Sequence, residues 1–151
     1  MGEHPETAAR MVDVTAKEVT DRTAEAVGLV RMAVETRSSV MARTLDKGDA
    51  LEVARIAGIM AAKKTSELIP LCHPISIGAA TVALAETQEG IEIRATVRTA
   101  DRTGVEMEAL TAVAVAALTV YDMVKGIDRS ASITDVRLVR KSGGRSGGWR
   151  A

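Results

Sequence analysis

Aromatic side chains are almost absent from this 151-residue sequence, which has one Tyr (Tyr121), one Trp (Trp149) and no Phe. Proteins that hold single-stranded nucleic acid rely on aromatic rings that stack on bases. An excess of charge is missing too, because 20 Lys and Arg residues balance 20 Asp and Glu residues. Nucleic-acid binding generally needs a basic face. We therefore expect no nucleic-acid partner.

Cysteine and histidine are scarce. The single cysteine, Cys72, cannot form an internal disulfide, which indicates a reducing compartment. One cysteine and two widely separated histidines, His4 and His73, cannot build a structural zinc site. We expect no bound metal ion and no cofactor.

Long apolar runs are missing as well. The first ten residues, MGEHPETAAR, carry charge and a proline where a secretory signal would be apolar. The region 109–120 is apolar over about 12 residues, short of the roughly 20 that a membrane-spanning helix needs. These features predict a cytoplasmic protein with no membrane partner.

The length and an apolar content of 46% are those of one globular domain. We expect a flexible N-terminus over residues 1–10 and a single α+β catalytic domain over residues 11–140. The composition of residues 141–151 predicts a flexible, glycine-rich basic tail.

Hydrophobic periodicity predicts the order strand, two helices, two strands, helix, strand. Asp49 is the expected N-cap of the second helix, which should continue to the region of Pro70. The expected strands are 23–32, 75–85, 91–99 and 133–139, and the expected helices are 34–45, 49 to about 70, and 105–125. This order is that of a ferredoxin-like βαββαβ fold with an antiparallel sheet, an added helix and helices packed on one face.

The last long helix carries charges at both ends. Glu106 and Glu108 lie in its first turn, and Asp122 and Lys125 lie in its last. Helical geometry places Glu108, Asp122 and Lys125 on one stripe, but Glu108 and Asp122 are about 21 Å apart along the axis. Either the two ends act separately, or neighbouring chains of a symmetric oligomer bring them together. The charges also suit the helix dipole, so a purely structural role stays open.

Two prolines, Pro70 and Pro74, hold Cys72 and His73 in a non-helical loop. His73 is a candidate general acid or base, or a ligand contact, with a structural histidine as the alternative. A Cys72–His73 nucleophile pair is disfavoured because sequence neighbours rarely reach the required geometry. Lys47 and Lys63, taken singly, are typical surface lysines.

Four motifs together resemble the cyclic pyranopterin monophosphate synthase family of molybdenum cofactor biosynthesis, also called its accessory protein C. They are Lys47–Asp49, Ile69–Pro74, Thr103–Thr111 and Tyr121–Lys125, and the resemblance extends from Met11 to Gly144. It implies an enzyme that converts 3′,8-cyclo-7,8-dihydro-GTP to cyclic pyranopterin monophosphate with release of pyrophosphate. It also implies a homohexamer built as a trimer of dimers.

The resemblance also implies roles for individual residues. Asp122 is the expected acid or base, and Lys47 and Lys125 are the expected catalytic lysines. The residues expected to bind substrate are Leu71, Cys72, His73, Met107, Glu108, Glu106 and Lys63. Lysines, with Lys141 or Arg145 as additions, suit the binding of phosphates. The alternative function is a non-catalytic ferredoxin-like sensor of small molecules, because this fold often serves as a regulatory module.

Overall fold

The computed structural model describes residues 7–145 and 147–151. Its elements follow the predicted order, with one further short helix and one further short strand. They are β1 (Thr20–Arg31), α1 (Val34–Ala42), α2 (Ala50–Lys63), α3 (Thr65–Leu68), β2 (Ile77–Glu86), β3 (Gly90–Asp101), α4 (Glu106–Val124), β4 (Ser132–Ser142) and β5 (Trp149–Arg150).

The strands form one antiparallel sheet in the order β2-β3-β1-β4-β5. Strand β1 lies in the middle and pairs with β3 along its whole length, from Thr20 opposite Asp101 to Arg31 opposite Gly90. Every second residue of β1, from Ala24 to Val30, lies on the helix side of the sheet, as the alternation predicts. The predicted α+β ferredoxin-like fold is confirmed.

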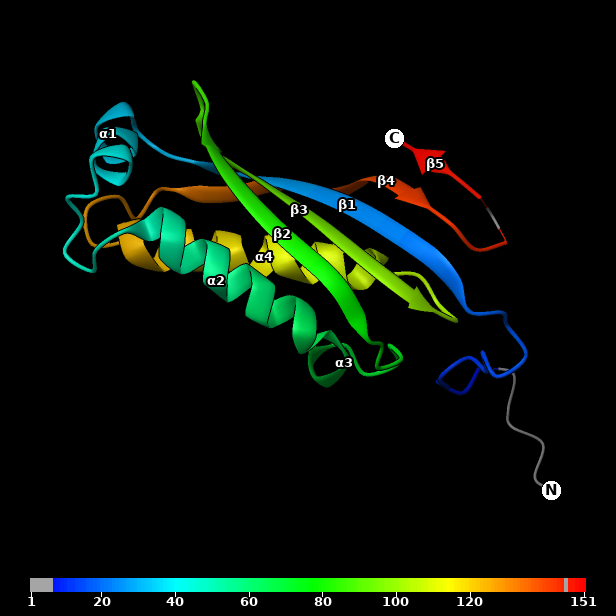
Figure 1. The fold of residues 1–151 in the computed structure, drawn as a ribbon. Coiled ribbons are helices and arrows are strands. Elements are labelled where there is room, and N and C mark those ends of the chain that lie inside the picture. The colour runs from blue at the N-terminus through cyan, green and yellow to red at the C-terminus, as the bar shows by residue number, and fades with distance from the viewer. Residues whose placement is uncertain (1–6, 146) are drawn as a thin grey trace.

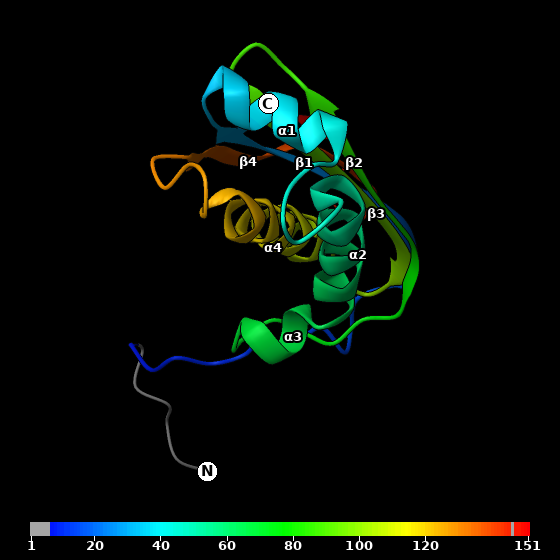
Figure 2. The same ribbon diagram turned by 90° about the vertical axis from the view of Figure 1, so that its left-hand side faces the viewer.

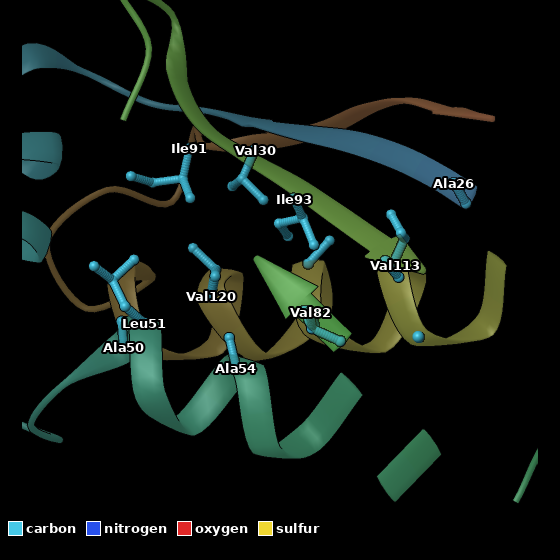
Figure 3. Close-up of a cluster of buried hydrophobic side chains, with 14 of the residues drawn as sticks. Ala26, Val30, Ala50, Leu51, Ala54, Val82, Ile91, Ile93, Val113 and Val120 are labelled. Carbon is cyan, nitrogen blue, oxygen red and sulfur yellow. The ribbon is translucent and has the colours of Figure 1, made fainter. Parts of the chain in front are cut away.

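Helices α2 and α4 cover one face of the sheet (Figures 1 and 2). Figure 3 shows Val30, Val82 and Ile93 of the sheet lying over Val113, Val120 and Ala54 of the helices. The two helices approach closely because small residues face each other. A Cβ on Gly58 of α2 would lie 3.0 Å from the carbonyl oxygen of Ala112 and 3.3 Å from Cβ of Ala116. The core is therefore dense because the backbones of the two helices approach closely, and it does not need large aromatic side chains.

Two helix boundaries differ from the prediction. Helix α1 ends at Ala42, short of the expected residue 45, because Arg43 takes a left-handed conformation (φ 59°) that caps the helix. The second predicted helix stops at Lys63, and the short helix α3 follows it. Ile69 ends α3 in an extended conformation, as expected of a residue before proline.

The C-terminal region carries more regular structure than the predicted tail. Strand β4 runs on to Ser142 because its last residues still pair with β1, and β5 pairs with β4 through Arg150 and Trp149. Residue 146 of the predicted tail, and residues 1–6 of the predicted flexible N-terminus, lie outside the described residues.

Helix α4 is long and apolar enough to span a membrane, whereas the apolar region expected from the sequence, 109–120, is shorter. In the fold it lies against α2, β1, β3 and β4, and more than half of its apolar stretch is buried. This is the placement of a core helix.

Candidate active site

Two hollows lie at opposite ends of α4. We call Lys47, Asp122 and Lys125, at its C-terminal end, the lysine cluster. We call Leu71, Cys72, His73, Glu106, Met107 and Glu108, at its N-terminal end, the Cys72 cluster. Together they hold nine of the ten residues named as site candidates above.

Local sequence brings Lys47 to the lysine cluster. It lies in the tight turn between α1 and α2, where Gly48 has a φ of 104° that favours glycine. Asp49 then begins α2, as predicted, because its side chain accepts hydrogen bonds from the backbone N–H groups of Leu51 (3.1 Å) and Glu52 (3.3 Å).

The carboxylate of Asp122 lies between two ammonium groups. Its Oδ2 is 2.7 Å from Nζ of Lys47, and its Oδ1 is 2.9 Å from Nζ of Lys125. These contacts lower the pKa of Asp122 to about 2, and the hydrogen bond from Lys47 is the largest cause, followed by that from Lys125. Asp122 is therefore ionised at neutral pH, and in this state it can accept a proton but has none to donate.

The hollow at the lysine cluster has a volume of about 350 Å³. One wall is the end of α1 and the turn after it, and the other is the end of α4 and the segment that follows. The polar residues that line it beyond the predicted three are Ser39, Thr44, Asp46 and Arg129. No local pattern marked these four residues, because they come together only through the approach of the two walls.

Glu108 is the buried member of the Cys72 cluster, with only 2% of its surface exposed. Its Oε1 lies 3.8 Å from the sulfur of Cys72, and its Oε2 has no hydrogen-bond partner among the described residues. Burial is the main cause of the raised pKa of Glu108. The pKa of Cys72 is also raised, mainly by burial and secondly by the nearby charge of Glu108. A raised pKa disfavours the thiolate form that a nucleophilic cysteine needs.

Glu106 is held at the edge of the same cluster. Its Oε1 lies 3.3 Å from Nζ of Lys141 on β4, and its carboxylate folds over Gly104. A Cβ at residue 104 would meet that carboxylate, so a larger residue there would require the flexible Glu106 side chain to shift. The N-terminal segment contributes Val12, Val14 and Lys17 to the hollow of about 440 Å³ beside the cluster.

The predicted stripe on α4 differs in burial along its length. Glu108 is buried, whereas half of the Asp122 side chain is exposed. The cause is that the loop with Cys72 covers the helix only at its N-terminal end. With 1.5 Å of rise per residue, Glu108 and Asp122 are separated by about 21 Å along the axis. One chain therefore does not bring the two clusters together.

Two predicted positions lie elsewhere. Lys63 is exposed on α2 and lines neither hollow. Arg145 lines a third hollow with Lys17 and Arg22, beside Gly144. Within residues 7–145 and 147–151, no group of three or more His, Cys, Asp or Glu side chains is placed to hold a metal ion.

Replacing Glu108 with glutamine should change how stability depends on pH. The pKa of Glu108 is raised in the folded protein, so its unfolded carboxyl ionises first as pH rises above about 4.5. Stability is then lost from that pH until the folded carboxyl also ionises. E108Q removes this loss, so its stability relative to the parent protein should be higher at pH 7.5 than at pH 4. Urea unfolding of both proteins at the two pH values measures the difference, and a difference independent of pH would contradict the assignment.

Comparison with known proteins places the chain in a family. A model of the MoaC family matches residues 11–144. A protein of Streptomyces coelicolor named cyclic pyranopterin monophosphate synthase is 59% identical over 142 residues, covering 94% of this chain and 84% of its own length. A protein of the same name from Dinoroseobacter shibae is 57% identical over 95% of this chain and 92% of its own length. A protein of Mycobacterium bovis named cyclic pyranopterin monophosphate synthase 3 is 60% identical over 144 residues, covering 95% of this chain and 81% of its own length. These matches cover nearly the whole domain, and the chain belongs to the MoaC family.

Proposed function

We propose that this protein is a cyclic pyranopterin monophosphate synthase. It converts 3′,8-cyclo-7,8-dihydro-GTP to cyclic pyranopterin monophosphate and releases pyrophosphate, a step of molybdenum cofactor biosynthesis. Family membership and the names of relatives that share more than half of its residues support this reaction. The sensor alternative is not favoured, because these relatives are named as enzymes.

The observation that carries the proposal is the lysine cluster. Closing a cyclic phosphate requires a hydroxyl to lose a proton while negative charge grows on the departing pyrophosphate. Asp122, ionised between Lys47 and Lys125, offers a proton acceptor beside two cations in one hollow. Phosphate oxygens that draw the lysines away from Asp122 would raise its pKa and make it a stronger base. We propose Asp122 as the acid or base and the two lysines as catalytic residues.

The Cys72 cluster supplies the proposed substrate contacts. His73 offers a second group for proton transfer, and Leu71 and Met107 offer apolar surface beside Cys72. Glu108 and Glu106 complete the set, and Lys141 beside Glu106 is a candidate for a phosphate contact. Lys63 stays a candidate only if a neighbouring chain brings substrate to its exposed position on α2.

We further propose that each active site combines the two clusters from two different chains. Their separation along α4 is too great for one small substrate to touch both ends of a single helix. A homohexamer arranged as a trimer of dimers, acting in the cytoplasm, would place the lysine cluster of one subunit against the Cys72 cluster of its neighbour.

The test is to incubate the purified protein with the cyclised GTP derivative and follow both products. Phosphorus NMR reports pyrophosphate, and mass spectrometry reports the pyranopterin. Equal amounts of the two are expected. Tight binding of the substrate with neither product would overturn the proposed reaction and favour the sensor.

A further inference from the structure

Helix α1, which leads into the Lys47 turn, joins the hydrophobic core through few apolar side chains, chiefly Val40 with Met41 packed against the same cluster. It buries only Thr36 and Val40. Its contacts with α2 and the sheet are sparse compared with those between α2 and α4. Leu45, between α1 and Lys47, is also buried in the core, so the positions of α1 and Lys47 depend on these apolar contacts together with polar ones.

The main polar contact at the start of α1 is with Asp128, in the segment that follows α4. Oδ2 of Asp128 accepts hydrogen bonds from the backbone N–H of Ala33 (3.0 Å) and from the hydroxyl of Thr36 (2.9 Å). Its Oδ1 accepts a hydrogen bond from the hydroxyl of Ser130 (2.8 Å). Asp128 is 9% exposed and Thr36 is 3% exposed. Hydrogen bonds to a sheltered carboxylate are among the stronger ones in proteins.

These bonds join the two walls of the lysine-cluster hollow. Ser39 of α1 and Lys47 lie on one wall, and Gly126 and Arg129, on either side of Asp128 in sequence, lie on the other. The hydroxyl of Tyr121 also donates to the carbonyl oxygen of Arg129 (3.1 Å), which ties the second wall to α4.

The other polar anchor of α1 points away from the hollow. Arg37 donates to the carbonyl oxygen of Thr87 (2.6 Å) and pairs with Glu86 (3.1 Å), both at the β2–β3 hairpin. Of these two anchors, only Asp128 connects α1 with the wall that follows Asp122 and Lys125.

We infer that Asp128 is a positioning residue of the proposed active site, which holds α1 so that the Lys47 turn stays within reach of Asp122. In this role Asp128 acts through Lys47. The effect on turnover rests on the proposed function, but the placement of Lys47 does not and can be measured without substrate.

The experiment is acylation of lysines by acetic anhydride at neutral pH, followed by mass spectrometry. Lys47 depends on the Asp128 contact, whereas Lys125 pairs with Asp122 within the same helix. In Thr36→Val, which cannot donate to Asp128, acylation of Lys47 relative to Lys125 should rise roughly two- to fivefold, as expected for loss of an exposed ion pair. Asp128→Ala should raise it at least as much, and kcat should fall in both variants.

Two further variants separate positioning from general loosening. Asp128→Asn keeps an oxygen that can accept hydrogen bonds from Ala33 and Thr36. The ratio of Lys47 to Lys125 acylation in this variant should therefore equal that of the parent protein. Ser130→Ala removes a bond to Asp128 that does not reach α1, so it should also keep the ratio. Equal increases at Lys47 and Lys125, or an unchanged ratio in Thr36→Val, would overturn the inference. A changed ratio in a protein that makes no product would leave the inference standing and reject the proposed function alone.

Discussion

Lys47→Ala should lower kcat for the cyclised GTP substrate by about 100- to 1,000-fold, because it removes one of the two cations that face Asp122. The melting temperature should hardly change, since both partners of the ion pair are about half exposed and exposed pairs contribute little to stability. Initial rates of pyrophosphate release and calorimetry of the same preparation measure the two effects.

Lys64→Ala is the matched control for this result. Lys64 is exposed, lines neither hollow and makes no ion pair among the described residues. The Lys64→Ala protein should have the same kcat as the parent protein. A Lys47→Ala protein that keeps kcat within about threefold would remove Lys47 from the proposed catalytic residues, because such a small change is below the usual effect of a catalytic group.

Mixed oligomers of Asp122→Ala and His73→Ala chains should recover activity that neither variant has alone. The two residues belong to opposite ends of α4, so a site shared between chains can take an intact lysine cluster from one variant and an intact Cys72 cluster from the other. Random mixing in equal amounts makes about a quarter of such sites complete. Coexpression with two different tags, tandem purification and assay of the mixed oligomer measure the recovery.

The control mixture is Lys47→Ala with Asp122→Ala. These residues meet at 2.7 Å within one chain, so every lysine cluster in the mixture stays incomplete and no recovery is expected. Failure of the Asp122→Ala and His73→Ala mixture, in oligomers shown to contain both chains, would place each active site within one subunit.

The secondary structure could be predicted from the sequence because its signals are local. Alternation of apolar residues predicted the central strand, Asp49 predicted the start of α2, and the apolar pattern after Gly104 predicted α4. The boundaries that the prediction missed depend on distant partners. Strand β4 extends beyond the residues 133–139 predicted from its apolar pattern, because β1 pairs with it as far as Ser142.

The candidate site could be predicted as a set of residues but not as an arrangement. Motif resemblance named Lys47, Asp122 and Cys72, yet no pattern in the chain indicated that Glu108 would be buried under Cys72. The role of Asp128 had no signal at all, because the aspartate and its partner Thr36 are 92 positions apart.

The sequence by itself determined the α+β class, the order of the elements and the residue types of the candidate site. Each of these depends on neighbours within a few positions, where helical and strand periodicity act. Only the tertiary structure decided that Lys47 pairs with Asp122, that the two clusters lie at opposite ends of α4, and that Asp128 joins the walls of one of them. Contacts between residues far apart in the chain form only when the sheet and both long helices pack together, and no local pattern contains that information.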